Sequence, residues 1–383
     1  MLVSRRALLI GSAALPAVSQ AVDIRAAGES RLNDARAVVT SMLAAEPIPA
    51  LSIAVIQGKE VIWAEAFGKA NLDLGVPATT AHRFRLGSVS KILTATLATR
   101  LATRGVVDLD APIAKYLPDL PEQHRATTLR QLLTHRGGIR HYLDKDWIPG
   151  QAGANIDYRD YASNAEVLAI FINDPLVAKP GERVSYSTFG YTLISIVLEA
   201  AAKTPFLELI QREIARPMAL ASVGPDAPRS IAANRVTGYD TAKNAGAVHP
   251  PLEGPWTNIL PINPAYKWAG GGLLATPTDL ARFGAAHWAP GVLDQRTLAD
   301  LFTVQTQATE RSPPLGLGWR IDEDPNKRLR WHHAGGQNGA RASLVVYPKE
   351  KLAIAFATNL TGAPGDVNGP SSAIANALLE IRT

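Results

Sequence analysis

Ser88 and Lys91 are the residues whose types and spacing first suggest chemistry in this sequence. They stand three positions apart at the start of a predicted helix, because apolar residues recur at helical spacing from Ile92 to Leu101. On one helical face, the lysine amine can reach the serine hydroxyl. A buried lysine loses its charge readily, and its neutral amine can then activate the serine as a nucleophile. The serine also fits a plain helix N-cap, so this pair needs support from the rest of the chain.

Tyr186 and Thr188 form a second candidate group, just before a helix predicted from about residue 189 to 202. A phenol held near a lysine can have its pKa lowered and act as a general base. The alternative is a core tyrosine whose hydroxyl is satisfied by the surrounding structure.

A third group is His333-Ala334-Gly335-Gly336, which lies between two strand-like runs. Glycines in a strand admit the close approach of another backbone, such as an extended substrate, and the histidine can meet a carboxylate. The alternative is a bulge or turn with an incidental histidine.

The elements that must position these groups are strands near the two ends of the chain, with most of the predicted helices between them. Strands are predicted at 51–56 and 61–67, paired around Gly58-Lys59, and again at 316–321, 329–332, 340–346 and 352–358. Helices are predicted over about 32–43, 88–105, 128–133, 189–202, 205–214 and 372–381, whereas 220–268 has no clear period. The pattern predicts an α+β protein, with a sheet domain of about 22–110 and 265–383 and a helical, irregular domain of about 111–264.

Composition narrows the classes of function. The 383 residues are 46% hydrophobic and 19% charged, which is typical of a globular protein, and the absence of cysteine excludes disulfides and thiolate chemistry. A net charge of +5 without basic clusters among aromatics gives no support for nucleic-acid binding. The eight histidines form no H-E-x-x-H, so we expect no metal or other cofactor, and full activity in a chelator would exclude one. The sequence also lacks the G-x-S-x-G of α/β-hydrolases.

Residues 1–21 are typical of an export signal. Arg5 and Arg6 form a charged start, residues 7–15 are apolar, and Ser19-Gln20-Ala21 offers small residues for cleavage. The paired arginines resemble a twin-arginine signal, which predicts an exported, periplasmic protein without a stable membrane span once the signal is removed. An uncleaved anchor and an organelle-targeting peptide are the alternatives.

The three groups together resemble a known family. An S-x-x-K, a Tyr-x-Asn-like triplet and a Lys/His-x-Gly in strands, in this order, are the motifs of the serine β-lactamase and penicillin-binding fold. The tyrosine resembles the class C β-lactamase branch, with its D-Ala-D-Ala carboxypeptidases, D-aminopeptidases and esterases. Linking segments are similar too, among them 132–138, 179–181, 186–191 and 271–276. The resemblance covers nearly the whole chain after residue 30.

The resemblance implies a role for each matching residue. Ser88 would be the acylated nucleophile, Lys91 and Tyr186 would share the proton transfer, and the N–H groups of Ser88 and Gly336 would form the oxyanion hole. His333, beside Gly335, would take the place of the motif-three lysine or histidine. His135-Arg136-Gly137 also fits H-x-G, but it closes a predicted helix, so we do not assign it as the third motif.

Two departures from the family pattern favour a peptidase or esterase over an efficient β-lactamase. Thr188 stands where β-lactamases of this branch carry asparagine, so it cannot offer an amide to a substrate acylamide. His333 replaces a lysine, which makes its charge depend on pH. We expect a small-molecule or short-peptide substrate. A class C-like β-lactamase and a non-catalytic penicillin-binding or sensor protein remain as alternatives, and the sequence gives no oligomeric state.

Overall fold

A seven-stranded antiparallel sheet forms the centre of the protein, in the order β3-β2-β1-β12-β11-β10-β9. The computed structural model describes residues 17–147, 155–243, 254–288, 291–309 and 312–379. Strands from the two ends of the chain meet in the middle of this sheet, where β1 pairs with β12. The seven strands are β1 (Ala50–Gln57), β2 (Glu60–Asn71), β3 (Val76–Pro77), β9 (Arg320–Glu323), β10 (Leu329–Gln337), β11 (Ala340–Tyr347) and β12 (Leu352–Thr358).

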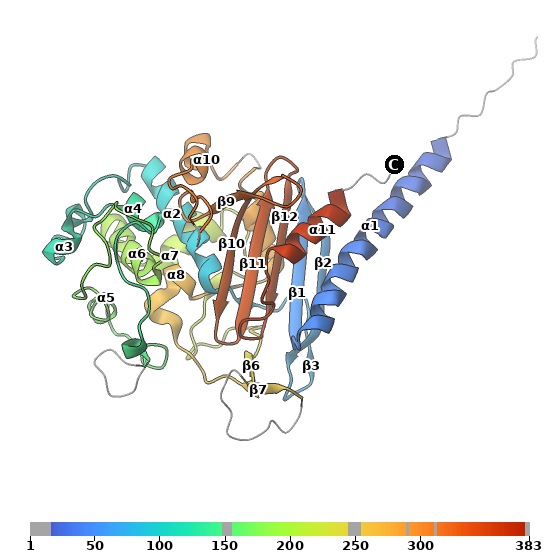
Figure 1. Ribbon diagram of the computed structural model, residues 1–383, viewed down its shortest axis with the longest axis horizontal. Coiled ribbons are helices and arrows are strands. Elements are labelled where there is room, and N and C mark those ends of the chain that lie inside the picture. The colour runs from blue at the N-terminus through green and yellow to red at the C-terminus, as the bar shows by residue number, and fades with distance from the viewer. Residues whose placement is uncertain (1–16, 148–154, 244–253, 289–290, 310–311, 380–383) are drawn as a thin grey trace, which may run out of the picture.

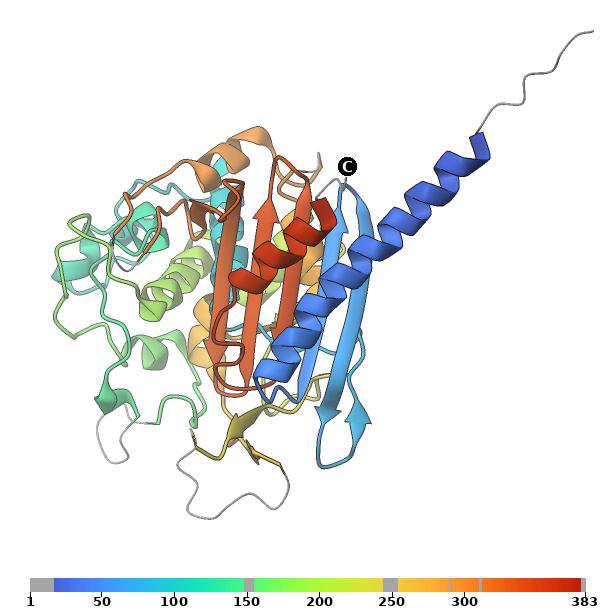
Figure 2. The same cartoon turned by 45° about the vertical axis from the view of Figure 1, so that its right-hand side comes forward.

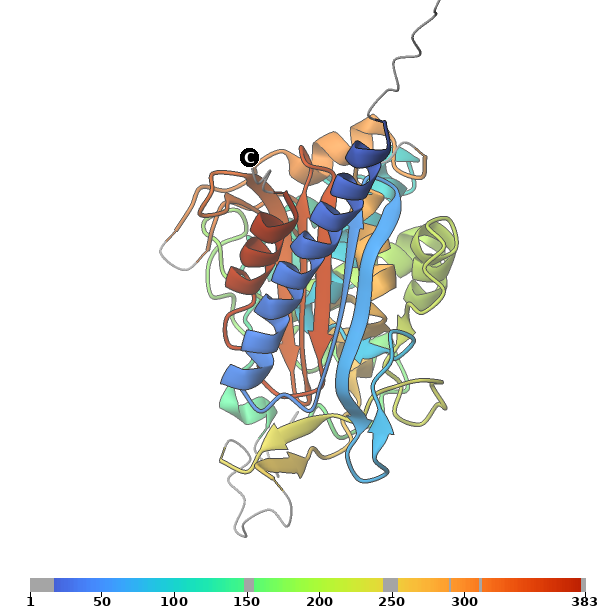
Figure 3. The same cartoon turned by 90° about the vertical axis from the view of Figure 1, so that its right-hand side faces the viewer.

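The two faces of the sheet carry side chains of different size. On β12, Leu352, Ile354 and Phe356 face the layer of α1 (Ala17–Ala45) and α11 (Gly369–Leu379), while the alanines between them face the other side. Helices α1 and α11 lie side by side across that face (Figures 2 and 3). The alanine face admits α9 (Pro277–Ala285), which packs on β1 and β12.

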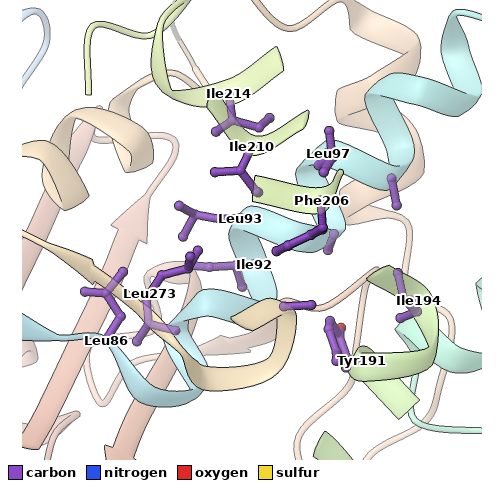
Figure 4. Close-up of a cluster of buried hydrophobic side chains, with 14 of the residues drawn as sticks. Leu86, Ile92, Leu93, Leu97, Tyr191, Ile194, Phe206, Ile210, Ile214 and Leu273 are labelled. Carbon is purple, nitrogen blue, oxygen red and sulfur yellow. The ribbon is translucent and has the colours of Figure 1, made fainter. Parts of the chain in front are cut away.

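The remaining helices gather on the alanine side of the sheet, away from α1 and α11 (Figure 1). Helix α2 (Ser90–Thr103) runs through the centre of this group of helices, and its residues are buried on all sides. Figure 4 shows Ile92, Leu93 and Leu97 of α2 among apolar side chains of α6 (Thr188–Ala202) and α7 (Phe206–Ile210). This packing holds the start of α2, and therefore Ser88 and Lys91, in a rigid setting.

The other elements are short. They are η1 (Gly87–Val89), η2 (Ile113–Lys115), α3 (Glu122–Arg125), α4 (Leu129–Leu133), η3 (Asp144–Asp146), α5 (Asn164–Leu168), η4 (Gln211–Ala215), η5 (Pro264–Lys267), α8 (Trp268–Gly271), α10 (Gln295–Phe302), β4 (Phe84–Arg85), β5 (Gly224–Pro225), β6 (Tyr239–Thr241), β7 (Trp256–Asn258) and β8 (Leu273–Ala275).

The structure confirms the predicted α+β class and most of the predicted elements. One strand prediction is wrong at its start, because residues 316–318 are bends, Trp319 is irregular, and β9 begins only at Arg320. The last helix runs from Gly369 to Leu379, so the predicted end at 381 lies outside the described residues. The predicted domain boundaries stay a prediction. Residues 1–16 of the predicted export signal also lie outside the described residues, and Ser19-Gln20-Ala21 lies within α1.

Candidate active site

Ser88 lies in the single turn η1 that leads into α2, so its hydroxyl stands before the helix rather than within it. Gly87 makes this turn possible, because its φ of +49° is in the left-handed region. A side chain at Gly87 would also come within 2.7 Å of the backbone nitrogen of Gly336 on β10. The turn that presents Ser88 is therefore packed directly on the third motif.

Lys91 is fully buried, and its amine has no carboxylate partner among the described residues. Its Nζ lies 3.1 Å from Ser88 Oγ, 3.2 Å from Thr188 Oγ1 and 2.5 Å from the carbonyl oxygen of Gly270. Burial, followed by the positive charges of Lys267 and Arg320, holds the pKa of Lys91 well below its usual range. The lysine therefore gives up its proton more readily than an exposed lysine, and its amine lies at hydrogen-bond distance from the serine, as the spacing predicts.

Tyr186 donates a hydrogen bond of 2.8 Å from its hydroxyl to Ser88 Oγ. The expectation that its pKa is lowered is wrong. Burial raises the pKa of Tyr186 to about 12, although the hydrogen bond to Ser88 acts in the opposite direction. Near neutral pH this residue is a protonated phenol, which makes it an acid rather than a base at Ser88.

Thr188 is the first residue of α6 and sits beside Lys91, which donates to its hydroxyl oxygen. The preceding Ser187 is the N-cap, since its Oγ accepts from the N–H of Gly190 at 3.0 Å. The capped start of α6 therefore holds Tyr186 against Ser88 and Thr188 against Lys91. Thr188 is buried, and its role toward the substrate stays a prediction from the sequence.

His333 faces the site from β10, whereas His332 points to the other side, 3.2 Å from the Asp322 carboxylate. The expectation of a histidine that titrates near neutral pH is wrong. Burial, then the charge of Arg320, holds the pKa of His333 well below its usual range. Its Nδ1 donates to the carbonyl oxygen of Ala334 at 2.7 Å, which places a proton on Nδ1, and the lowered pKa favours the neutral ring.

Gly335 admits a backbone, as predicted, but that backbone belongs to the protein itself. A side chain on Gly335 would lie 1.9 Å from the carbonyl oxygen of Leu86 and 2.9 Å from the backbone nitrogen of Ser88. Gly336 is exposed and lines the cavities at Ser88. Gly335 therefore joins β10 to the Ser88 turn, and Gly336 is the glycine that a substrate can reach.

Two further histidines pack against Tyr186, and the sequence reasoning did not assign either of them. The ring of His135 lies 4.3 Å from the Tyr186 ring, and its Nδ1 accepts from the N–H of Ser187 at 3.2 Å. His141 meets Tyr186 edge-on, and burial, together with the charge of nearby Lys267, lowers its pKa to about 4. Although His135 is not the third motif, this segment supports the phenol.

Lys267 and Asp157 form a buried ion pair at 3.2 Å on the other side of Ser88. Burial acts to lower the pKa of Lys267, but Tyr142 and Asp157 outweigh it and the pKa is raised. Lys267 stands only three residues before Gly270, whose carbonyl accepts from Lys91. The segment 267–270 therefore places a permanent positive charge near Lys91. In the sequence, the feature that could have pointed to Lys267 is its position just before residues 271–276, which resemble the family.

Arg320, the first residue of β9, is the other cation at the site. Its side chain lines a cavity of about 490 Å³ together with Ser88, Tyr186, His333 and Gly336. Within the described part of the chain, it makes no ion pair or side-chain hydrogen bond. An unpaired guanidinium beside the nucleophile is suited to bind a carboxylate. A second cavity of about 210 Å³ lies on the Lys267 side of Ser88 and is lined also by Thr188.

Comparison with known proteins identifies the family. The sequence model of the family described as Beta-lactamase matches residues 35–379. This chain belongs to the beta-lactamase family. It is 26% identical to the human serine beta-lactamase-like protein LACTB, mitochondrial, over 77% of this chain and 68% of the relative.

Other members of the beta-lactamase family extend the comparison. The chain is 27% identical to esterase EstB of Burkholderia gladioli, over 72% of this chain and 76% of the esterase. Its fold matches a D-amino acid amidase from Ochrobactrum anthropi SV3 with a TM-score of 0.78 at 21% identity, over 90% of this chain and 98% of the amidase. The fold and the family expected from the three motifs are thereby confirmed.

Proposed function

We propose that this member of the beta-lactamase family is a serine hydrolase that acts through an acyl-enzyme at Ser88 on a peptide, amide or ester bond. The observation that carries the proposal is the fully buried amine of Lys91, whose pKa is held well below its usual range, at 3.1 Å from Ser88 Oγ. A lysine without a carboxylate partner in a dry environment is a base, and a serine beside such a base is a nucleophile.

The steps follow from the positions of the hydrogen-bond donors. Ser88 Oγ bonds to the carbonyl carbon of the substrate while its proton passes to Lys91. The N–H groups of Ser88 and Gly336 stabilise the oxyanion. The carbon–leaving group bond then breaks, Tyr186 donates its proton to the departing atom, and Lys91 returns the captured proton to the phenolate. Water attacks the acyl-enzyme with the same groups in reverse order, which releases the acid and restores Ser88.

The unpaired Arg320 supports a substrate with a carboxylate next to the scissile bond. Because His333 is neutral, Arg320 takes over the role that the sequence resemblance gives to the motif-three cation. Thr188 offers one hydroxyl, which already accepts from Lys91, so it gives little help to the acylamide of a β-lactam. These two features favour a peptidase, amidase or esterase over an efficient β-lactamase.

The test is intact-mass detection of the acyl-enzyme with short acyl esters, D-amino-acid peptides and a β-lactam. We expect an adduct on the wild-type protein, none on Ser88→Ala, and an unchanged adduct on Ser41→Ala, whose serine is exposed on α1. An adduct that persists in Ser88→Ala refutes the assignment. An adduct with the β-lactam that never turns over, without hydrolysis of any ester or peptide, favours the sensor alternative.

We further propose that the protein is exported through the arginine pair at Arg5 and Arg6. Among the described residues, no helix combines the length and the apolar character needed to cross a bilayer. Expression in a bacterial host, with fractionation and N-terminal mass analysis, tests this proposal. We expect a periplasmic protein that begins near residue 22, and retention in the cytoplasm when both arginines are changed to lysine.

A further inference from the structure

Three oxygen atoms surround the amine of Lys91, and this arrangement suits the charged form of a lysine. Ser88 Oγ, Thr188 Oγ1 and the carbonyl oxygen of Gly270 lie at 3.1, 3.2 and 2.5 Å from Nζ. An ammonium has three N–H donors, so it can satisfy all three oxygens at once. If Lys91 is to accept the proton of Ser88, another feature of the site must oppose this charged form before the reaction begins.

Lys267 is such a feature, because it brings a second positive charge into the same buried region. Its side chain is buried and lines the cavity of about 210 Å³ that also reaches Ser88. A Cβ on Gly271 would lie 3.8 Å from Lys267 Cδ. The residue before Gly271 is Gly270, whose carbonyl oxygen accepts from Lys91. Two positive charges in a region shielded from water repel each other more strongly than they do in solvent.

Asp157 holds Lys267 in its charged form. The buried carboxylate accepts from Lys267 Nζ at 3.2 Å and from the hydroxyl of Tyr266 at 3.0 Å. The Lys267 amine also lies 5.1 Å from the centre of the Tyr266 ring and 5.7 Å from the centre of the Tyr142 ring. Burial, and to a smaller extent the charge of Arg85, lower the pKa of Lys267, but Tyr142 and Asp157 outweigh them and the pKa is raised.

The other titratable groups that face Lys91 from the described residues give no comparable fixed charge. Arg320 is positive but partly exposed, so solvent screens its charge. Burial favours the neutral form of the remaining groups, because it lowers the pKa of the histidines and raises that of the tyrosines. These groups are His135, His141, His333, Tyr186 and Tyr191. In agreement with this, burial lowers the pKa of Lys91 most, followed by Lys267 and then Arg320.

We propose that Lys267 is a positioning residue whose positive charge keeps the amine of Lys91 free of a proton until Ser88 supplies one, and that Asp157 keeps Lys267 charged. This inference rests on the proposed acyl-enzyme at Ser88. When the Ser88 proton reaches Lys91, the repulsion from Lys267 also favours its onward transfer to the Tyr186 phenolate. Neither Lys267 nor Asp157 belongs to the three sequence motifs of the site.

The test is the pH dependence of kcat/KM for a neutral p-nitrophenyl ester, whose acid limb reports the protonation of Lys91 in the free enzyme. Lys267→Met should move this limb upward by about one pH unit or more, the scale on which one nearby charge shifts a pKa. The double variant with Lys267→Met and Asp157→Asn, which leaves no unpaired carboxylate, should show the same upward shift. Asp157→Asn alone should also move the limb upward, because a buried lysine without its partner loses its charge readily.

Lys267→Arg keeps the positive charge and should leave the limb in place. Asp160→Asn is the matched control, since Asp160 is exposed and follows Asp157 by three residues, and it should leave the limb in place too. If Lys267→Met and the double variant lose rate equally at every pH, without a shift of the limb, the role of Lys267 is structural and the inference is overturned.

A second measurement follows Lys91 without any substrate. In protein labelled with ¹³C-lysine, the Cε signal that is absent in Lys91→Met should titrate at higher pH in the double variant than in the wild type. An unchanged titration overturns the inference even where the adduct on Ser88 forms normally. Failure to form that adduct with any ester, peptide or β-lactam overturns the proposed function instead, so the two failures are distinguishable.

Discussion

Replacing Arg320 with methionine tests which group at the site binds a carboxylate. The substrates are a peptide with a free C-terminal carboxylate and the same peptide as its C-terminal amide. A hydrogen bond to a charged partner contributes about 1.5–3 kcal/mol, which corresponds to roughly 10- to 150-fold in kcat/KM. Because the Arg320 side chain is partly exposed, solvent screening favours the lower end, about tenfold.

The quantity to measure is the ratio of kcat/KM for the acid to that for the amide. Arg320 also lowers the pKa of Lys91, so its removal raises the charged fraction of that amine and slows both substrates. The ratio cancels this common effect and isolates the carboxylate contact. Arg320→Lys should retain part of the preference, and Arg216→Met, at an exposed position, should leave it intact.

The dependence on pH separates Arg320 from His333. Because His333 is held neutral, the acid-to-amide ratio of the wild type should stay flat between about pH 6 and 8, where an ordinary histidine titrates. A ratio that falls across this range and becomes flat in His333→Gln would refute the reasoning. It would show that the imidazolium, and not the guanidinium, binds the carboxylate.

Three other predictions concern buried groups. Lys91→Met and Tyr186→Phe should each lower kcat by about 10²–10⁴-fold, and the double variant should lose little more, because the two residues act on one proton path. Since the pKa of Tyr186 is about 12, steady-state rates should show no loss from its ionisation below about pH 10; such a loss, absent in Tyr186→Phe, would contradict the acid role. His287 is buried outside the site, and this burial lowers its pKa to about 4. Between about pH 4 and 6.5, the unfolded state therefore binds a proton that the folded state does not bind. The free energy of unfolding should therefore fall by about 1.6 kcal/mol for this group as the pH falls from 6.5 to 5. Urea titrations of His287→Gln should show a shallower pH dependence; an identical dependence would refute the lowered pKa of His287.

The sequence was sufficient for the parts of the site that depend on local spacing. Lys91 follows Ser88 by three residues at the start of α2, and Tyr186 and Thr188 flank the capping serine of α6, so these positions could be predicted from neighbouring residues. The strand pairs around the turn at Gly58 were predictable for the same reason, since alternation and turn residues are local features.

The sequence could not give the properties that depend on burial and distant charges. Arg320 lies on a strand whose start was misplaced by four residues, and nothing near it in sequence indicates that it meets Ser88. The direction of the Tyr186 pKa shift depends on burial, which outweighs its hydrogen bond to Ser88. His333 was recognised by its motif, but its pKa is set by burial and by Arg320, which is distant in the sequence.

The pairing of β1 with β12 has a consequence for biosynthesis. Ala50 donates to the side chain of Asn359 across a separation of 309 residues, so the middle of the sheet closes only after nearly all of the chain has been made. Until then, the β1–β2 hairpin has an open edge that other chains can pair with. The Ser88 turn likewise lacks Gly335 and Gly336 until β10 leaves the ribosome. A partly synthesised chain should therefore bind chaperones through β1, and it should acquire hydrolytic activity only when synthesis is almost complete.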